Sequence, residues 1–103
     1  MIEALLQKQV LAHLMQVPDS FFWRANTGAA KTARGFVHFG LPGQSDVLGL
    51  VRGRFVAVEL KSEDGRLRPE QRAFRDRVLR AGGIYIVARS VDDALNPIRE
   101  LLR

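Results

Sequence analysis

Cysteine is absent from the 103-residue sequence, and its absence narrows the chemistry that the protein can perform. A chain without thiols has no disulfides, no thiolate zinc site and no cysteine nucleophile, so oxygen ligands remain as the main route to a metal ion. Histidine is scarce too, because His13 and His38 stand far apart without a second histidine at ligand spacing. We interpret both histidines as structural or solvated residues.

Long apolar runs are also missing. No run approaches the roughly 18 residues of a membrane-spanning helix, and the N-terminus carries Glu3 in a helical pattern instead of the segments of a secretory signal. We therefore expect a cytoplasmic, intracellular protein with no membrane partner.

Acidic residues are in the minority, since 16 Lys and Arg face 11 Asp and Glu and give a formal net charge of +5. This balance favours a polyanionic partner such as nucleic acid.

The length suits one domain, which we expect to span residues 1–103. Hydrophobic periodicity predicts the order helix, strand, hairpin, helix, strand, helix, which is typical of an α/β domain. The corresponding segments are 2–15, 21–26, 46–51 with 54–61, 69–80, 84–89 and 91–103.

Glycine and proline mark the ends of several elements. Pro69 fits the first turn of a helix that stops before Gly82, the expected place for a left-handed C-cap. Pro97 is expected to kink the last helix or to delay its start. Residues 27–43 carry four glycines and no sustained period, so we interpret them as a long basic loop.

The two apolar runs joined around Arg52 and Gly53 predict an antiparallel hairpin that carries unexpected charges. A turn of two or four residues places Asp46 directly opposite Glu59, so that both side chains share one face of the sheet. Lys61 lies two residues beyond Glu59 and therefore points to the same face. A turn of three residues would shift the register by one and separate the carboxylates.

The predicted cluster raises an electrostatic problem. Two carboxylates about 5 Å apart repel by roughly 3 kcal/mol at an effective dielectric constant of 20, and Lys61 offsets only part of this. A hard divalent cation such as Mg²⁺ would neutralise them, bound by Asp46, Glu59, a backbone carbonyl such as that of Leu60, and water. The alternative is a solvated ion triad at an edge of the sheet, and the pattern alone leaves both interpretations open.

Several polar residues precede the hairpin. Arg24, Lys31 and Arg34 are candidates for contacts to a nucleic-acid backbone, although a basic loop also simply keeps a chain soluble. Asn26 would hydrogen-bond near a scissile phosphate or would merely end a strand. The segment from Asn26 to Thr32 faintly resembles a phosphate-binding loop, but Ala30 stands where glycine should precede the lysine. We therefore expect no nucleotide cofactor.

The segments WRANTG, GLPGQSD, VELKSEDGRLRPEQ and AGGIYIV occur in the order and at spacings that fit a known family. The sequence resembles the VRR-NUC (virus-type replication-repair nuclease) branch of the PD-(D/E)XK nuclease superfamily over most of its length. The resemblance implies a restriction-endonuclease-like core, a mixed β-sheet flanked by helices. Two positions depart from the pattern: Ser45 replaces the superfamily's proline, and Arg68 replaces a frequent serine that would be a good N-cap.

The resemblance also assigns roles to residues. It implies that Asp46 and Glu59 bind Mg²⁺ or Mn²⁺, and that Lys61 positions the attacking water or stabilises charge on the phosphate. Glu3 would be an outer acidic ligand from the first helix, and Gln71 would face the same site from the second. Considered without the resemblance, Glu3 and Gln71 are unremarkable polar residues in first helical turns.

The activity implied is that of a metal-dependent endonuclease that hydrolyses phosphodiester bonds. The resemblance implies a homodimer that acts on branched DNA, such as the four-way (Holliday) junctions of DNA repair, in a bacterium or a phage-infected cell. The alternative is a non-catalytic nucleic-acid-binding module with a vestigial acidic cluster. A nuclease that reads sequence is disfavoured, because no element looks free to enter the major groove. Parity does not decide whether Tyr85 faces the site.

Overall fold

The computed structural model describes residues 3–25 and 28–103, and for 28–31 and 36–39 it describes the backbone only. The elements follow one another as α1 (Glu3–Leu14), β1 (Ser20–Arg24), β2 (Gly28–Thr32), β3 (Gly35–Phe39), β4 (Val47–Val51), β5 (Arg54–Leu60), α2 (Pro69–Arg80), β6 (Ile84–Ala88) and α3 (Val91–Leu101). Strands β1, β4, β5 and β6 form one sheet in this spatial order, antiparallel except for the parallel pair β5–β6. The predicted α/β fold with a mixed sheet flanked by helices is confirmed.

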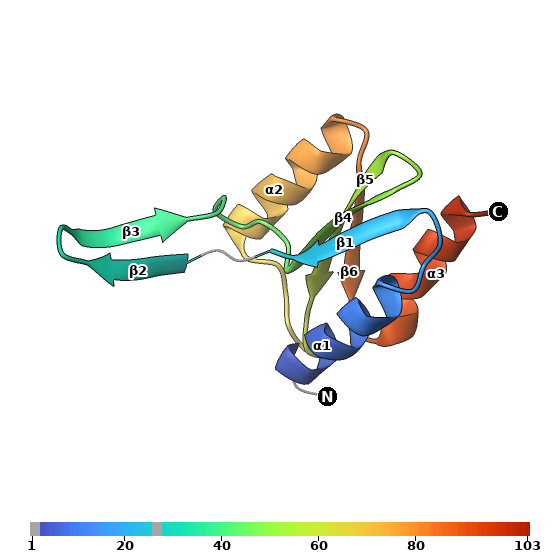
Figure 1. The fold of residues 1–103 in the computed structure, drawn as a ribbon, viewed down its shortest axis with the longest axis horizontal. Helices are drawn as coiled ribbons and strands as arrows, with labels where there is room; N and C mark the ends of the chain where they lie inside the picture. The colour runs from blue at the N-terminus through green and yellow to red at the C-terminus, as the bar shows by residue number, and fades with distance from the viewer. Residues whose placement is uncertain (1–2, 26–27) are drawn as a thin grey trace.

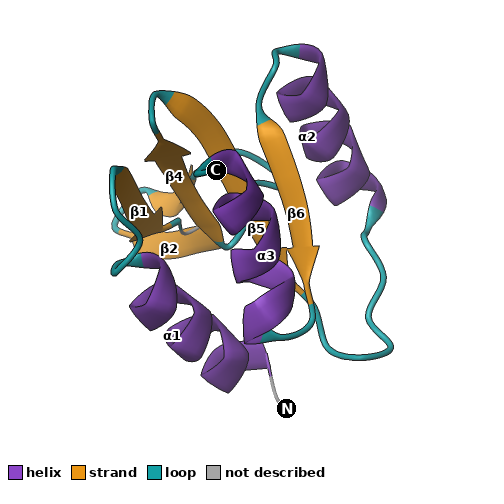
Figure 2. Ribbon diagram, turned by 90° about the vertical axis from the view of Figure 1, so that its right-hand side faces the viewer, coloured by secondary structure: helices purple, strands orange, loops and turns teal. Residues whose placement is uncertain are grey.

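The helices divide between the two faces of this sheet. Helices α1 and α3 pack against each other and against one face, where the buried apolar residues form the core. Helix α2 lies alongside β6 on the other side, apart from α1 and α3 (Figure 2). The core side chains are Leu6, Val10, Leu14, Phe22, Val47, Val51, Val56, Val58, Leu60, Ile86, Ala88, Ala94, Leu95 and Ile98.

The β4–β5 hairpin has the register that the sequence predicts. Val47 pairs with Val58 and Val51 with Arg54, which leaves a two-residue turn of Arg52 and Gly53. Both turn residues have positive φ, +49° and +83°, as a type I′ turn requires. The backbone N–H of Arg52 donates to the carbonyl of Asp19, which ties this unusual conformation to the body of the fold.

Helix α2 begins at Pro69 and ends at Arg80, as the sequence predicts. Gly82 follows it with φ of +88°, the left-handed conformation of a C-terminal cap. Helix α3 begins at Val91 without delay, because the Ser90 hydroxyl accepts a hydrogen bond from the Asp93 backbone N–H at 3.1 Å. Pro97 lies inside this helix, so the expectation of a delayed start is wrong.

The expected long loop at residues 27–43 is also wrong in part. Strands β2 and β3 pair with each other as a separate two-stranded hairpin that extends away from the rest of the molecule (Figure 1). The Thr32 hydroxyl donates to the Gly35 carbonyl at 2.9 Å and closes its turn. The sequence does not predict these strands, because they are short, contain glycine and show little apolar periodicity. None of the helices in the described ranges is long and apolar enough to cross a membrane.

Candidate active site

Asp46 lies where the β4–β5 ladder ends, one residue before Val47. Its backbone carbonyl accepts a hydrogen bond from the Ala25 N–H at 2.9 Å, and its carboxylate Oδ2 accepts one from the Leu60 N–H at 2.8 Å. The carboxylate thus accepts a backbone hydrogen bond from β5 just beyond the last pair of the β4–β5 ladder. This bond holds the Asp46 side chain against the strand that carries Glu59 and Lys61.

Glu59 and Lys61 are both buried, with 3% and 8% of their surfaces exposed. The Lys61 ammonium lies 3.8 Å from Oε2 of Glu59, at the outer limit of an ion pair. Strand β5 is an interior strand of the sheet. The alternative of a solvated ion triad at a sheet edge is therefore wrong, and the cluster faces the electrostatic cost that the sequence indicates.

Gln71 joins this cluster from the first turn of α2. Only 4% of its surface is exposed, and its amide Nε2 donates to Oε2 of Glu59 at 3.2 Å. Its Oε1 accepts a hydrogen bond from the Arg68 backbone N–H at 2.8 Å. Because a backbone N–H can only donate, this second bond fixes the amide orientation and directs the NH₂ group at the carboxylate. The same bond satisfies the backbone N–H of Arg68, the N-cap residue of α2.

A glycine explains how the segment before Asp46 reaches α2. Gly43 has φ of +74°, and a side chain there would collide with the backbone carbonyl of Glu70 in the first turn of α2. Glycine is required both by the conformation and by this close approach. The segment Gly40 to Ser45 therefore runs directly past the N-terminus of α2, which brings Asp46 and Gln71 to the same place.

Burial changes the protonation chemistry of Glu59. The pKa of its carboxyl is raised from 4.5 to about 8, first by desolvation and then by the nearby Asp46, while Lys61 and Arg68 only partly oppose these effects. Oε1 of Glu59 is buried and lacks a hydrogen-bond partner within the described part of the chain. Two neighbouring carboxylates with an open oxygen fit a hard divalent cation, which would lower this pKa.

Glu3 stands apart from this pair. It is exposed in the first turn of α1, and within residues 3–25 and 28–103 no group of three or more His, Cys, Asp or Glu side chains could hold a metal ion. The structure therefore does not bring Glu3 to Asp46 and Glu59, and its role as an outer ligand stays a prediction. The ligand role of the Leu60 carbonyl also stays a prediction, while its side chain lies in the core, as expected.

The residues predicted to contact nucleic acid precede Asp46 in the sequence. Arg24 ends β1 and Arg34 lies in the turn between β2 and β3, and both are exposed. Lys31 belongs to β2, of which only the backbone is described there, and Asn26 lies outside the described residues. Their roles in binding remain predictions.

The sequence does not assign Ser45 to the site and does not decide which face Tyr85 occupies. The parallel register pairs Tyr85 with Ala57, two residues before Glu59, so Tyr85 shares the face of the carboxylates. Ser45 is fully buried beside Asp46. No turn links β5 directly to β6, so the sequence contains no signal that would have fixed this register.

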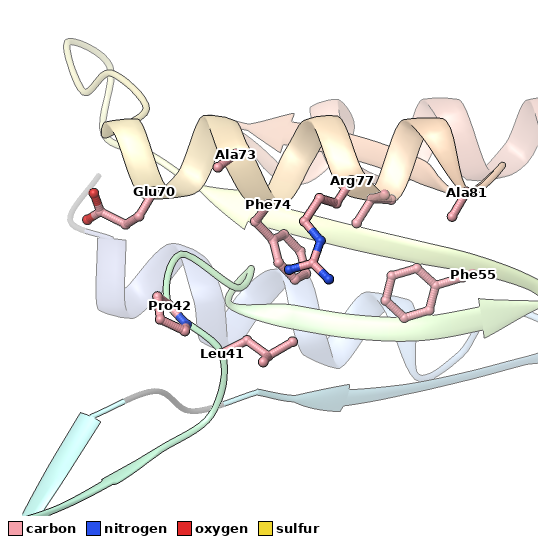
Figure 3. A pocket seen from close by; sticks show the side chains of 10 residues that line it. Leu41, Pro42, Phe55, Glu70, Ala73, Phe74, Arg77 and Ala81 are labelled. Atoms are coloured by element: carbon pink, nitrogen blue, oxygen red, sulfur yellow. The ribbon is translucent and has the colours of Figure 1, made fainter.

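A cavity lies apart from these residues. It has a volume of about 580 Å³ and lies between α2, Phe55 of β5 and the segment of Leu41 and Pro42. Figure 3 shows Phe55, Phe74 and the Arg77 guanidinium turned toward one another in it. None of the predicted catalytic residues lines this pocket, so it is not the site of the carboxylates.

Comparisons with known proteins agree with the geometry. The family described as the VRR-NUC domain matches residues 5–92. A solved structure titled VRR_NUC domain has a similar fold, with a TM-score of 0.67 and 20% identity over 94% of each chain. No curated protein matches the chain. The fold is that of an α/β domain, and the family match makes it a nuclease domain. More particularly, the chain belongs to the VRR-NUC domain family.

Proposed function

We propose that this nuclease domain is a Mg²⁺- or Mn²⁺-dependent endonuclease that hydrolyses phosphodiester bonds in DNA. One observation carries the proposal: Glu59 is buried beside Asp46 with an unpartnered oxygen and a pKa raised to about 8. A folded protein gains nothing in stability from such an arrangement. The arrangement is explained if the two carboxylates exist to hold a cation and a phosphate.

In each of the two carboxylates, one oxygen is bound by the protein and the other is available to a cation. Oε2 of Glu59 is held by Gln71 and lies near Lys61, which leaves Oε1 for the cation. Asp46 gives Oδ2 to the Leu60 N–H and offers its second oxygen. When bound, the cation would polarise the phosphate and lower the pKa of an attacking water. Each carboxylate is therefore clamped at one oxygen and presents the other.

Lys61 supplies the positive charge of the protein itself. Its side chain is 10% exposed, so the ammonium stays beside the carboxylates instead of turning into solvent. There it can hold a water molecule for attack or stabilise the charge that develops on the phosphate. A fixed ammonium in a poorly solvated site acts more strongly than one in water.

The partner we propose is branched duplex DNA, bound by a two-fold dimer that cuts opposite strands. The net charge of +5 and the exposed Arg24 and Arg34 support the nucleic-acid partner. An uncovered apolar face on β1 and β4 supports the dimer, since Phe21, Trp23 and Leu50 are 66%, 39% and 40% exposed. Sedimentation of the purified chain tests the dimer, and Phe21→Ser should shift it toward monomer; a monomeric wild type would contradict it.

A cleavage assay tests the activity. Wild type and Glu59→Gln are incubated with a labelled four-way junction, flap, nicked and linear duplex, in Mg²⁺, in Mn²⁺ and in EDTA. We expect wild-type cleavage with either metal ion, strongest on the junction, and binding without cleavage by Glu59→Gln. Glu63→Gln, which changes an exposed acid in the following turn, is the matched control and should cleave normally.

The same assay separates the alternative. A non-catalytic binding module with a vestigial acidic cluster would bind the junction but cleave none of the substrates in either metal ion. The buried, hydrogen-bonded state of the cluster argues against that alternative, because a vestigial buried charge is costly and readily lost. Wild-type binding without any cleavage would nevertheless replace our proposal with it.

A further inference from the structure

Three buried side-chain atoms lack a hydrogen-bond partner within the described residues: Oγ of Ser45, Oε1 of Glu59 and Oη of Tyr85. Buried polar groups in folded proteins are nearly always hydrogen-bonded, so each such atom calls for an explanation. Here all three belong to one neighbourhood. A shared explanation is therefore preferable to three separate ones.

The register of the strands brings these atoms together. Tyr85 pairs with Ala57 across the parallel β5–β6 ladder. Glu59 is two residues after Ala57, so the Tyr85 side chain projects from the same face as Glu59 and is its diagonal neighbour. Ser45 immediately precedes Asp46, whose carboxylate reaches β5. The pKa of Tyr85 agrees with this placement, because it is raised to about 12 first by burial and then by the charge of Glu59, with Ser45 opposing the rise.

We propose that Tyr85 and Ser45 are positioning residues for Glu59: one buried water accepts a hydrogen bond from the Tyr85 hydroxyl, donates one to Oε1, and also contacts the Ser45 hydroxyl. This inference rests on the proposed metal site. A carboxylate oxygen has two lone pairs, so Oε1 can accept this bond and hold a cation at the same time. The hydroxyls of Tyr85 and Ser45 and Oε1 of Glu59 then all have hydrogen-bond partners.

The consequence is a carboxylate fixed from two sides. Gln71 of α2 holds Oε2, and Tyr85 of β6 holds Oε1 through the proposed water. Hydrogen bonds from outer residues orient the ligands of metal ions, and their removal typically weakens metal binding by about 10- to 100-fold. Tyr85 therefore sets the affinity of the site for its cation without touching the cation.

Calorimetric titration with Mn²⁺ tests this role without measuring cleavage. Tyr85→Phe removes only the hydroxyl, and we expect the dissociation constant to rise by about 10- to 100-fold. Ser45→Ala should act in the same direction and less strongly. Ser20→Ala is the matched control, because the Ser20 hydroxyl donates to the Val17 carbonyl at 2.7 Å, outside this site, and its loss should leave Mn²⁺ affinity unchanged.

A spectroscopic measurement gives a second and independent test. Tyr85 is the only tyrosine in the sequence, so the tyrosine doublet in the ultraviolet resonance Raman spectrum reports its hydrogen bonding directly, even without metal. We expect a donating phenol in the wild type and a changed doublet in Ser45→Ala. A phenol without a hydrogen bond would overturn the inference, as would wild-type Mn²⁺ affinity in a folded Tyr85→Phe.

These outcomes remain distinguishable from failure of the proposed function. A wild type that takes up no Mn²⁺ overturns the metal site, whereas the Raman doublet of the metal-free protein still decides the hydrogen bond. A wild type that binds Mn²⁺ with the same affinity as Tyr85→Phe overturns only the positioning role. If Tyr85→Phe fails to fold, Ser45→Ala and the Raman spectrum keep the inference testable.

Discussion

The two faces of strand β5 have opposite characters although they share one backbone. On the face toward α1 and α3, Val56, Val58 and Leu60 are at most 1% exposed and pack into a continuous apolar core. On the face toward α2, Glu59 and Lys61 are buried, and Oε1 of Glu59 has no hydrogen-bond partner among the described residues. Adjacent residues therefore serve different ends, stability on one face and chemistry on the other.

The difference shows how a small domain accommodates a costly site. Side chains alternate along a strand, so a position can be devoted to charge without disturbing the neighbours that build the core. The apolar face contributes enough free energy of unfolding for the fold to tolerate the destabilising carboxylate pair on the opposite face. Substitutions at neighbouring positions should accordingly have effects of different kind and sign.

The largest effect on stability is expected on the core face. Leu60→Ala should lower the free energy of unfolding by about 2–5 kcal/mol, because it removes fully buried methyl groups and leaves a cavity. Urea unfolding followed by circular dichroism measures this. Leu41→Ala is the control, since this leucine is 57% exposed and its loss should cost less than about 0.5 kcal/mol. Equal losses in both variants would contradict the burial of Leu60 in the core.

The adjacent Lys61 should affect catalysis instead. Lys61→Met keeps the apolar stem and removes the charge, so we expect stability close to wild type and a cleavage rate lower by about 10²–10³-fold. Single-turnover kinetics on the junction in Mg²⁺ measures the rate. Lys8→Met, on the exposed surface of α1, should cleave at the wild-type rate. A Lys61→Met rate within threefold of wild type would refute the role of the ammonium.

Glu59→Gln should stabilise the metal-free protein at high pH. Because burial raises the folded pKa to about 8 from 4.5, the folded state holds a proton between these values that the unfolded state has lost. The free energy of unfolding therefore falls as pH rises from 4.5 to 8, and the loss is complete above that window.

The glutamine variant lacks this ionisation, so in EDTA it should exceed the wild type by about 1–3 kcal/mol at pH 9, and the advantage should vanish below pH 4.5. Thermal unfolding across this pH range measures the difference. Added Mg²⁺ should stabilise the wild type and leave Glu59→Gln unchanged. A variant less stable than wild type at pH 9 in EDTA would contradict the burial cost of Glu59.

The smallest effects are expected at the exposed arginines. Arg24→Ala and Arg34→Ala should each weaken DNA binding several-fold and lower the slope of log K against log salt by about 1, similarly for all sequences. Fluorescence anisotropy at several salt concentrations measures the slope. Arg103→Ala is the control, because Arg103 pairs with Glu100 at 3.5 Å at the end of the chain. An unchanged slope for Arg34→Ala would show that the β2–β3 turn does not contact DNA.

Sequence reasoning succeeded where a local signal fixes the structure. Pro69 and Gly82 mark the ends of α2 through their backbone preferences alone, and the turn at Arg52 and Gly53 fixes the register that aligns Asp46 with Glu59. Each of these features depends on residues that are close in the chain. For this reason the central pair of carboxylates could be predicted before the fold was known.

Elements whose partners are remote in the chain, or whose pattern is weak, could not be predicted from the sequence. The β2–β3 hairpin was missed because its short strands lack an apolar stripe. Tyr85 could not be assigned to a face, because β6 reaches β5 only after the whole of α2, and no turn sets their register. Gln71 was assigned to the site only through family resemblance, since its contact with Glu59 spans two separate elements.

The sequence by itself determined that Glu59 and Lys61 share one face of a strand, and that Asp46 joins them if the turn has two or four residues. Only the tertiary structure decided that this face is buried under α2, and that Gln71 and Tyr85 reach it. The reason is physical: alternation and turns act between chain neighbours, whereas burial and the pKa of Glu59 depend on elements that meet only when the whole domain has folded.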